Sequence, residues 1–216
     1  MVLLNQITKE IRETKGSKTK LFRDIAKKYK KELSHISMDD IYILCDELLK
    51  RVNRPETIVA YQILFDQKKR YTEETIDVFE QYLYNYIHDW WDCDDFMTHA
   101  FQYVLMKYPS HFNRIKEWVK HERFAVRRSA AVVLIVPAKK KAIDQDFIFD
   151  VCNLLMNDEH YLVQKGYGWL LKVASGEYHD VVIDYLEENV HQMTRTAYRY
   201  ALENLPKEEK ERLMRL

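Results

Sequence analysis

Glycine and proline are scarce in this chain, with four of each among 216 residues. A β protein of this length needs many turn residues, so the scarcity argues against a sheet-rich fold. Cysteine is scarce too, and the three cysteines lie far apart, with neither a disulfide framework nor the spacing of metal ligands. We therefore expect a reducing, cytoplasmic compartment and no metal or other cofactor.

Long apolar runs and net charge are also missing. The apolar stretch at the N-terminus is too short for a signal peptide, and no window reaches the length of a transmembrane helix. Lysine plus arginine and aspartate plus glutamate each number 34, so the formal net charge is zero. Nucleic-acid binders are usually basic, but a basic face can be offset by an acidic back, so neutrality does not exclude one. We expect a monomer that does not use a membrane as a partner.

What the sequence does have is helical periodicity over nearly its whole length. In SMDDIYILCDELLKRV, residues 37–52, Ser37 is placed to cap a helix whose apolar residues fall on one face. Pro55, Pro109 and Pro206 each stand where a helix can begin. The pattern predicts an all-α fold of about a dozen short helices.

A weak internal repeat runs through this pattern. Five segments place a small residue before apolar residues, at intervals of 30 to 40 residues. The small residues are Ala60, Ala100, Ala130, Gly166 and Ala197. Paired helices that recur with such a period are typical of α-solenoids built from HEAT-like repeats, whose concave faces bind ligands. We expect residues 1–216 to form one domain of this class.

Two adjacent tryptophans stand among four aspartates in YIHDWWDCDDF, residues 86–96. Tryptophan is costly to expose and aspartate is costly to bury, so the combination needs a reason. One interpretation is structural: the aspartates form an acidic helix start that complements the helix dipole, and the tryptophans belong to the core. We expect Trp90 in the core, whereas Trp91 fits a core or a cleft equally well.

Four motifs together resemble signatures of the DNA alkylation repair family, the AlkD-like DNA glycosylases built from HEAT-like repeats. The motifs are WWDCDD at 90–95, VRRSAAVVL at 126–134, LVQKGYGWLL at 162–171 and MTRTAYRYAL at 193–202. Each motif alone is weak, but the first and third in this order are fairly specific together. The resemblance covers about residues 21–205.

The resemblance implies a site on a concave surface that faces double-stranded DNA. It places catalytic residues in the first and third motifs and DNA-binding residues in the last three. The expected set is Trp91, Asp95 and Trp169 for catalysis, with Arg128, Lys165 and Arg195 holding phosphates.

The implied reaction is excision of cationic N3- or N7-alkylated purines. The alkyl group makes the base a good leaving group, so no general acid is needed to protonate it. The deoxyribosyl cation that develops resembles an oxocarbenium ion, which a nearby carboxylate stabilises. Tryptophan faces attract cations and pack on sugar. In this family the base need not be flipped into a pocket, in contrast to most glycosylases.

Other interpretations stay open beside this one. Gly166 and Gly168 inside a helical pattern are explained by close helix packing, and the basic run at 18–31 by a solvated face. Family members usually carry an F/L-G-V/I-x-x-P-x-x-R motif that helps grip DNA, but this chain has no glycine between Gly16 and Gly166. The alternatives are a catalytically weak or inactive DNA-binding paralogue with weak, electrostatic binding, and a protein-interaction scaffold.

Overall fold

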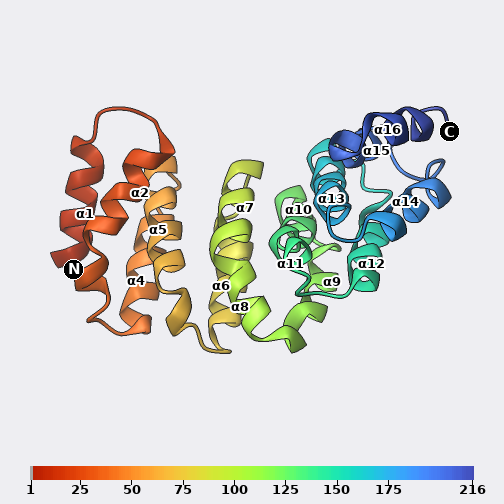
Figure 1. Cartoon of the computed structure of the whole chain (residues 1–216). Coiled ribbons are helices and arrows are strands. Elements are labelled where there is room, and N and C mark those ends of the chain that lie inside the picture. The colour runs from red at the N-terminus through yellow and green to blue at the C-terminus, as the bar shows by residue number, and fades with distance from the viewer. Residues whose placement is uncertain (1) are drawn as a thin grey trace. The chain divides into compact units, whose positions relative to one another are not determined.

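The structure is a computed structural model that describes residues 2–216, and the chain divides into two compact units. The N-terminal unit comprises the chain up to Ile87 together with His99–Lys107. The C-terminal unit comprises His88–Thr98 together with Tyr108–Leu216. Every regular element among the described residues is a helix (Figure 1), which confirms the predicted all-α class. The assignment of residues 1–216 to one domain stays a prediction.

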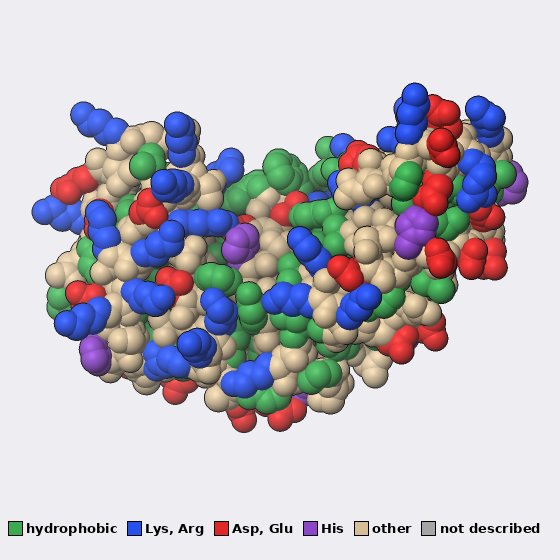
Figure 2. Space-filling view, viewed as in Figure 1, with side chains coloured by type: hydrophobic (Ala, Val, Ile, Leu, Met, Phe, Trp, Pro, Cys, Tyr) green, Lys and Arg blue, Asp and Glu red, His purple; other side chains and the backbone are tan. Residues whose placement is uncertain are grey.

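The N-terminal unit is built around α5, which packs against both α2 and α4, while α1 packs against α2. Its elements are α1 (Val2–Glu13), α2 (Thr19–Lys28), α3 (Lys30–Leu33), α4 (Met38–Leu49), α5 (Arg54–Asp66), the 3-10 turn η1 (Lys68–Arg70), α6 (Thr75–Tyr86) and α8 (Gln102–Lys107). Lysine and arginine side chains gather over α1, α2, α4 and α5 on the face that Figure 2 shows.

Local sequence explains where these helices begin. The Ser37 hydroxyl accepts a hydrogen bond from the backbone N–H of Asp40 at 3.0 Å, so it caps α4 as predicted. Pro55 lies in the first turn of α5, where its missing N–H costs nothing. The α2 helix turns Phe22, Ile25 and Ala26 into the core, which leaves its lysines on the solvated side.

The C-terminal unit has two layers of helices. In one layer α10 lies between α7 and α13, and α13 lies between α10 and α15; in the other, α9, α12 and α14 pack behind them. Its elements are α7 (Trp90–Phe96), the 3-10 turn η3 (Pro109–Arg114), α9 (Ile115–Trp118), α10 (Phe124–Val132), α11 (Ile135–Lys139), α12 (Gln145–Leu155), α13 (Tyr161–Ala174), α14 (His179–Glu188), α15 (Arg195–Ala201), the 3-10 turn η4 (Leu202–Asn204) and α16 (Lys207–Leu213).

The small residues of the predicted repeat lie where the first layer packs. Ala130 on α10, Gly166 on α13 and Ala197 on α15 are all buried. Small side chains let neighbouring helices approach closely, so the repeat reports helix packing, as expected. The three cysteines are buried and free.

The π-helical turn Met97–Phe101 connects α7 to α8. A π-turn inserts an extra residue into the helical ladder and rotates the side chains that follow it. The chain passes from the C-terminal unit to the N-terminal unit within this turn. The boundary between the two units therefore lies within the π-turn, directly after α7.

Candidate functional site

An open pocket with a volume of about 410 Å³ lies on the first helix layer of the C-terminal unit. Four of its lining side chains are aromatic, three are basic and one is acidic. We call it the aromatic pocket; it is lined by Trp90, Asp94, Arg128, Tyr161, Leu162, Lys165, Trp169, Lys172 and Tyr200. The residues come from α7, α10, α13 and α15, so four helices of one layer build it.

The charged centre of the pocket is an ion pair between Asp94 and Arg128. Arg128 donates from Nε to Oδ1 and from Nη2 to Oδ2 of Asp94, both at 2.9 Å. Its Nη1 donates to the backbone carbonyl of Leu162 on α13. Arg128 is 5% exposed, and all three of its nitrogens are engaged. The arginine therefore fixes the carboxylate and ties α7, α10 and α13 together.

Burial raises the pKa of the Asp94 carboxyl, although its hydrogen bonds and charge interaction with Arg128 lower it. The carboxylate is only partly buried, and its side chain keeps 22% of its surface in contact with solvent. A negative charge therefore sits at the pocket wall, where a cationic ligand can approach it.

Two glycines on α13 make this arrangement possible. A Cβ atom on Gly166 would lie 3.3 Å from Cγ and 3.4 Å from Nη1 of Arg128, so the glycine leaves room for that side chain to cross the helix. A Cβ atom on Gly168 would lie 2.6 Å from the carbonyl oxygen of Ala197 and 2.9 Å from Cβ of Tyr200. Close packing is therefore the reason for both glycines, as one of the interpretations predicted.

The start of α7 is fixed by a capping box. Asp89 accepts from the N–H of Trp90 at 2.7 Å, and Asp92 accepts from the N–H groups of His88 and Asp89 at 2.9 Å. Asp92 is buried, and desolvation raises its pKa to about 6 against the opposing effect of these backbone bonds. For Asp92 the structural interpretation of the acidic cluster is therefore correct.

The expectation that Trp90 lies in the core is wrong, because its side chain is 48% exposed and lines the aromatic pocket. The α7 helix buries Asp92, Cys93 and Phe96 instead. Trp90 precedes Asp92 by two residues, and at 100° per residue this places it well away from the buried stripe. Cys93, one of these buried residues, contacts α10, and its Sγ lies 3.2 Å from Oγ of Ser129.

The structure brings three of the six predicted site residues together. Arg128, Lys165 and Trp169 line the aromatic pocket, whereas Trp91, Asp95 and Arg195 are not among its lining residues. Trp91 and Asp95 are half-buried on α7, and Arg195 is exposed at the start of α15.

Sequence reasoning missed Asp94, Tyr161, Lys172 and Tyr200. One signal was present, because Lys165, Trp169 and Lys172 are spaced four and three residues apart and so share one face of α13.

Both lysines of the aromatic pocket lie over tyrosine rings. Nζ of Lys165 is 5.4 Å from the ring centre of Tyr161, and Nζ of Lys172 is 4.7 Å from that of Tyr200. Lys172 also pairs with Glu203 at 2.8 Å. These cation–π contacts place the two positive charges beside the pocket, where a polyanion running past the site would meet them.

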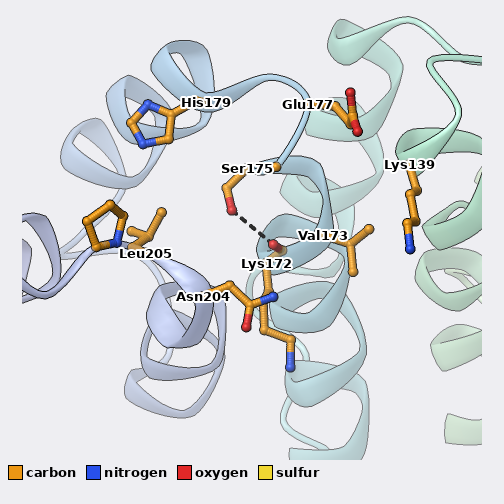
Figure 3. A pocket seen from close by; sticks show the side chains of 10 residues that line it. Lys139, Lys172, Val173, Ser175, Glu177, His179, Asn204 and Leu205 are labelled. Atoms are coloured by element: carbon orange, nitrogen blue, oxygen red, sulfur yellow. Dashed lines mark hydrogen bonds between the residues drawn. The ribbon is translucent and has the colours of Figure 1, made fainter.

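A second pocket of about 440 Å³ shares Lys172 with the aromatic pocket. Figure 3 shows Lys172 and Lys139 with Asn204 and Ser175 around it, and the Ser175 hydroxyl donates to the carbonyl of Lys172 at 2.9 Å. His179, also at this pocket, lies between Asp180 at 3.1 Å and Glu209 at 3.0 Å. Its pKa is raised by these two carboxylates, Asp180 first.

Within residues 2–216, no three His, Cys, Asp or Glu side chains are grouped as ligands for a metal ion. No helix in the same range is both long enough and apolar enough to cross a bilayer.

Comparisons with known proteins bear on both family and fold. A family model described as DNA alkylation repair enzyme matches residues 4–205. No curated protein sequence matches the chain. A solved structure described as a predicted DNA alkylation repair enzyme from Enterococcus faecalis is similar, with a TM-score of 0.78 and 20% sequence identity. The match covers 89% of this chain and 88% of that chain, and it confirms the predicted α-solenoid class.

Proposed function

Because the chain belongs to the family of DNA alkylation repair enzymes, we propose that it is a DNA N-glycosylase for cationic N3- or N7-alkylated purines. The observation that carries the proposal is the aromatic pocket, in which the indole rings of Trp90 and Trp169 and the carboxylate of Asp94 line one open cavity. Aromatic faces and a carboxylate are the groups that attract a positively charged base and sugar.

The reaction breaks the bond between C1′ of the deoxyribose and the purine nitrogen. The bonding electrons leave with the base, whose alkyl group already gives it a positive charge, so the base departs neutral without protonation. Positive charge passes to the sugar, where a carboxylate stabilises it and orients the water that adds to C1′. The proton of that water goes to solvent or to the carboxylate, and the product is an abasic site.

Two neighbouring carboxylates compete for this role. The family resemblance assigns it to Asp95, together with Trp91. The pocket favours Asp94, because Asp94 and Trp90 line the cavity with Trp169. We take Asp94 as the first candidate and keep Asp95 as the second.

DNA contacts are proposed for the basic residues beside the pocket. Lys165 and Lys172 stand on the same face of α13 as Trp169, and Arg195 is exposed at the start of α15. Arg128 was expected to hold a phosphate as well, but its engagement with Asp94 and Leu162 favours a positioning role. In this proposal the phosphates are held by the lysines and Arg195, and Arg128 orients the carboxylate.

One observation favours a second candidate function, a DNA-binding paralogue that excises little or nothing. Arg128 occupies both oxygens of Asp94, which offsets part of the negative charge that the transition state needs. Such a protein would still bind DNA through its lysines and would hold an alkylated base without releasing it.

Single-turnover release of 7-methylguanine from duplex DNA tests the proposal. We expect release by the wild type, and a loss of about two to three decades in rate for Asp94→Asn with little change in Kd. Asp95→Asn is the matched variant: a large loss there and a small one in Asp94→Asn would return the role to Asp95. No release by the wild type, with DNA binding intact, would establish the second candidate function instead.

A further inference from the structure

A groove in the N-terminal unit carries two arginines that have no partner in the described chain. The groove has a volume of about 370 Å³, and we call it the arginine groove; it is lined by Asn5, Thr8, Lys9, Arg12, Glu13 and Arg51. Five of these residues belong to α1 and follow the spacing of one helix face, and Arg51 follows the end of α4. From this juxtaposition we propose that the arginine groove binds a phosphate group.

The charges of the arginine groove are unbalanced in favour of an anion. Three of its residues are basic and one is acidic. Lys9 lies 3.8 Å from Glu13 on the same helix, so that lysine and that glutamate offset each other. Arg12 and Arg51 remain, with two positive charges available to the anionic oxygens of a phosphate group.

The residue before Arg51 has ion-pair partners, whereas Arg51 has none among the described residues. Lys50, the preceding residue, pairs with Asp46 at 2.7 Å and Glu47 at 3.0 Å. The carboxylates at the end of α4 are thus engaged by the lysine and not by the arginine. Arginine presents a planar set of donors that fits two phosphate oxygens at once, which a lysine does not.

The backbone at Val52, the residue that follows Arg51, has a strained conformation. Val52 has a φ of 47°, a left-handed conformation that is rare for a β-branched residue, and it is 72% exposed. Strain of this kind costs about 1–2 kcal/mol and persists where the surroundings impose it, often at ligand sites. Here the strained residue lies directly beside Arg51, which lines the groove.

Thr8, one of the residues that line the arginine groove, carries a polar atom with unmet bonding capacity. Thr8 is 5% exposed, and its Oγ1 is buried without a hydrogen-bond partner among the described residues. A buried hydroxyl of this kind usually has a partner in water or a ligand. A water that enters beneath a bound phosphate would supply one.

The phosphate can belong to the backbone of DNA, where it carries one negative charge, or to a small phosphorylated molecule, where it carries up to two; both present anionic oxygens to the guanidinium groups. The inference goes beyond the proposed function, because it concerns a different unit and requires no alkylated base. Failure of base release therefore leaves it standing, and its own failure leaves the glycosylase proposal standing.

Titration with inorganic phosphate, followed by calorimetry, is the first test. The variant is Arg12→Ser/Arg51→Ser, and the matched control is Lys30→Ser/Lys31→Ser, which removes two exposed charges of the same unit outside the groove. We expect the wild type and the control to bind alike and the arginine variant to lose at least about tenfold in affinity. Equal binding by all three proteins, or an equal loss in the control, overturns the proposal.

A second arm identifies the source of the phosphate. Binding of an unmodified DNA duplex is measured against salt, where each phosphate contact contributes about 0.9 to the slope of log K against log salt. A slope shallower by about 1 in the arginine variant than in the control, as expected for the loss of one phosphate contact, assigns the groove to DNA. An unchanged slope, with phosphate binding lost, assigns it to a small phosphorylated molecule. Arg12→Lys/Arg51→Lys keeps both charges, and an intermediate affinity is expected because the paired donors are gone.

Discussion

The aromatic pocket and the arginine groove use the same residue type in opposite ways. In the pocket, Arg128 is buried and donates three hydrogen bonds to Asp94 and Leu162. In the groove, Arg12 and Arg51 are exposed and have no partner in the described chain. A guanidinium whose donors are all used holds the protein together, whereas one whose donors are unused is available to a ligand. Pairing, more than position on a basic surface, therefore separates structural arginines from ligand-binding ones.

The largest expected effect tests this contrast through stability. Arg128→Ala leaves the half-buried carboxylate of Asp94 and the carbonyl of Leu162 without their donor, so we expect a loss of about 3 kcal/mol in the free energy of unfolding. Arg12→Ala removes no hydrogen bond or ion pair within the described chain, and a change within about 0.5 kcal/mol is expected. Urea denaturation of both variants measures the difference. If Arg128→Ala cost as little as Arg12→Ala, the ion pair between Arg128 and Asp94 would not stabilise the fold.

A smaller effect is expected where α13 meets α15, the wall of the aromatic pocket. Gly168→Ala would force a Cβ against the backbone carbonyl of Ala197, and rigid backbone cannot move aside cheaply. We expect a loss of about 2 kcal/mol after the gain in helix propensity of about 1 kcal/mol. Thermal or urea unfolding measures it.

Gly166→Ala is the matched control for this prediction. Its Cβ would lie 3.3 Å from Cγ of Arg128, so that side chain would have to shift by only a few tenths of an ångström, and the gain in helix propensity should offset most of the cost. Equal losses for the two glycine variants would show that propensity or general crowding, and not the α13–α15 approach, decides the outcome.

The fold was largely predictable because its signals are local. Ser37 and Pro55 mark helix starts, and Ala130, Gly166 and Ala197 mark close packing between helices, wherever the helices come to lie. The repeat period also indicates which helices occupy equivalent positions in successive repeats. Caps, periodicity and small residues act within a few residues of the chain, so one sequence is enough to read them.

The site was harder to predict because it depends on which side of a helix faces which neighbour. Trp90 with Asp94 and Trp91 with Asp95 are two identical pairs, spaced four residues apart and turned by about 100° from each other. The contact of Cys93 with Ser129 and the reach of Arg128 place the first pair at the aromatic pocket. Those contacts are tertiary, so no local pattern announces them.

The arginine groove had no sequence signal at all. Arg12 and Arg51 lie far apart in the chain and meet only because α1 folds beside the end of α4. The basic run at 18–31 of the same unit was predicted to form a solvated face, and lysine and arginine side chains lie on the surface of this unit in Figure 2. Arg12 and Arg51 are distinguished only by the absence of a partner among the described residues.

The smallest expected effect compares two aspartates at equivalent places in the two units. Asp92 in α7 and Asp40 in α4 are both third residues of capped helices, but Asp92 is buried and Asp40 is exposed. Desolvation raises the pKa of Asp92 from 3.8 to about 6. The folded state therefore holds this proton more tightly than the unfolded chain does. The free energy of unfolding should consequently rise as the pH falls through about 6, by about 1 kcal/mol between pH 7.5 and 5.5.

Urea denaturation at these two pH values, for the wild type and two variants, separates the Asp92 contribution from that of other titrating groups. Asp92→Asn should lose the rise, because the group that takes up the proton is gone. It should also be less stable than the wild type at both pH values, because one amide oxygen replaces two carboxylate oxygens that accept hydrogen bonds from backbone N–H groups. Asp40→Asn should keep the full rise, since it leaves Asp92 in place. If Asp92→Asn kept the rise as well, a group other than Asp92 would be taking up the proton. The three backbone N–H groups that bond to Asp92 would then lower its pKa at least as much as its burial raises it.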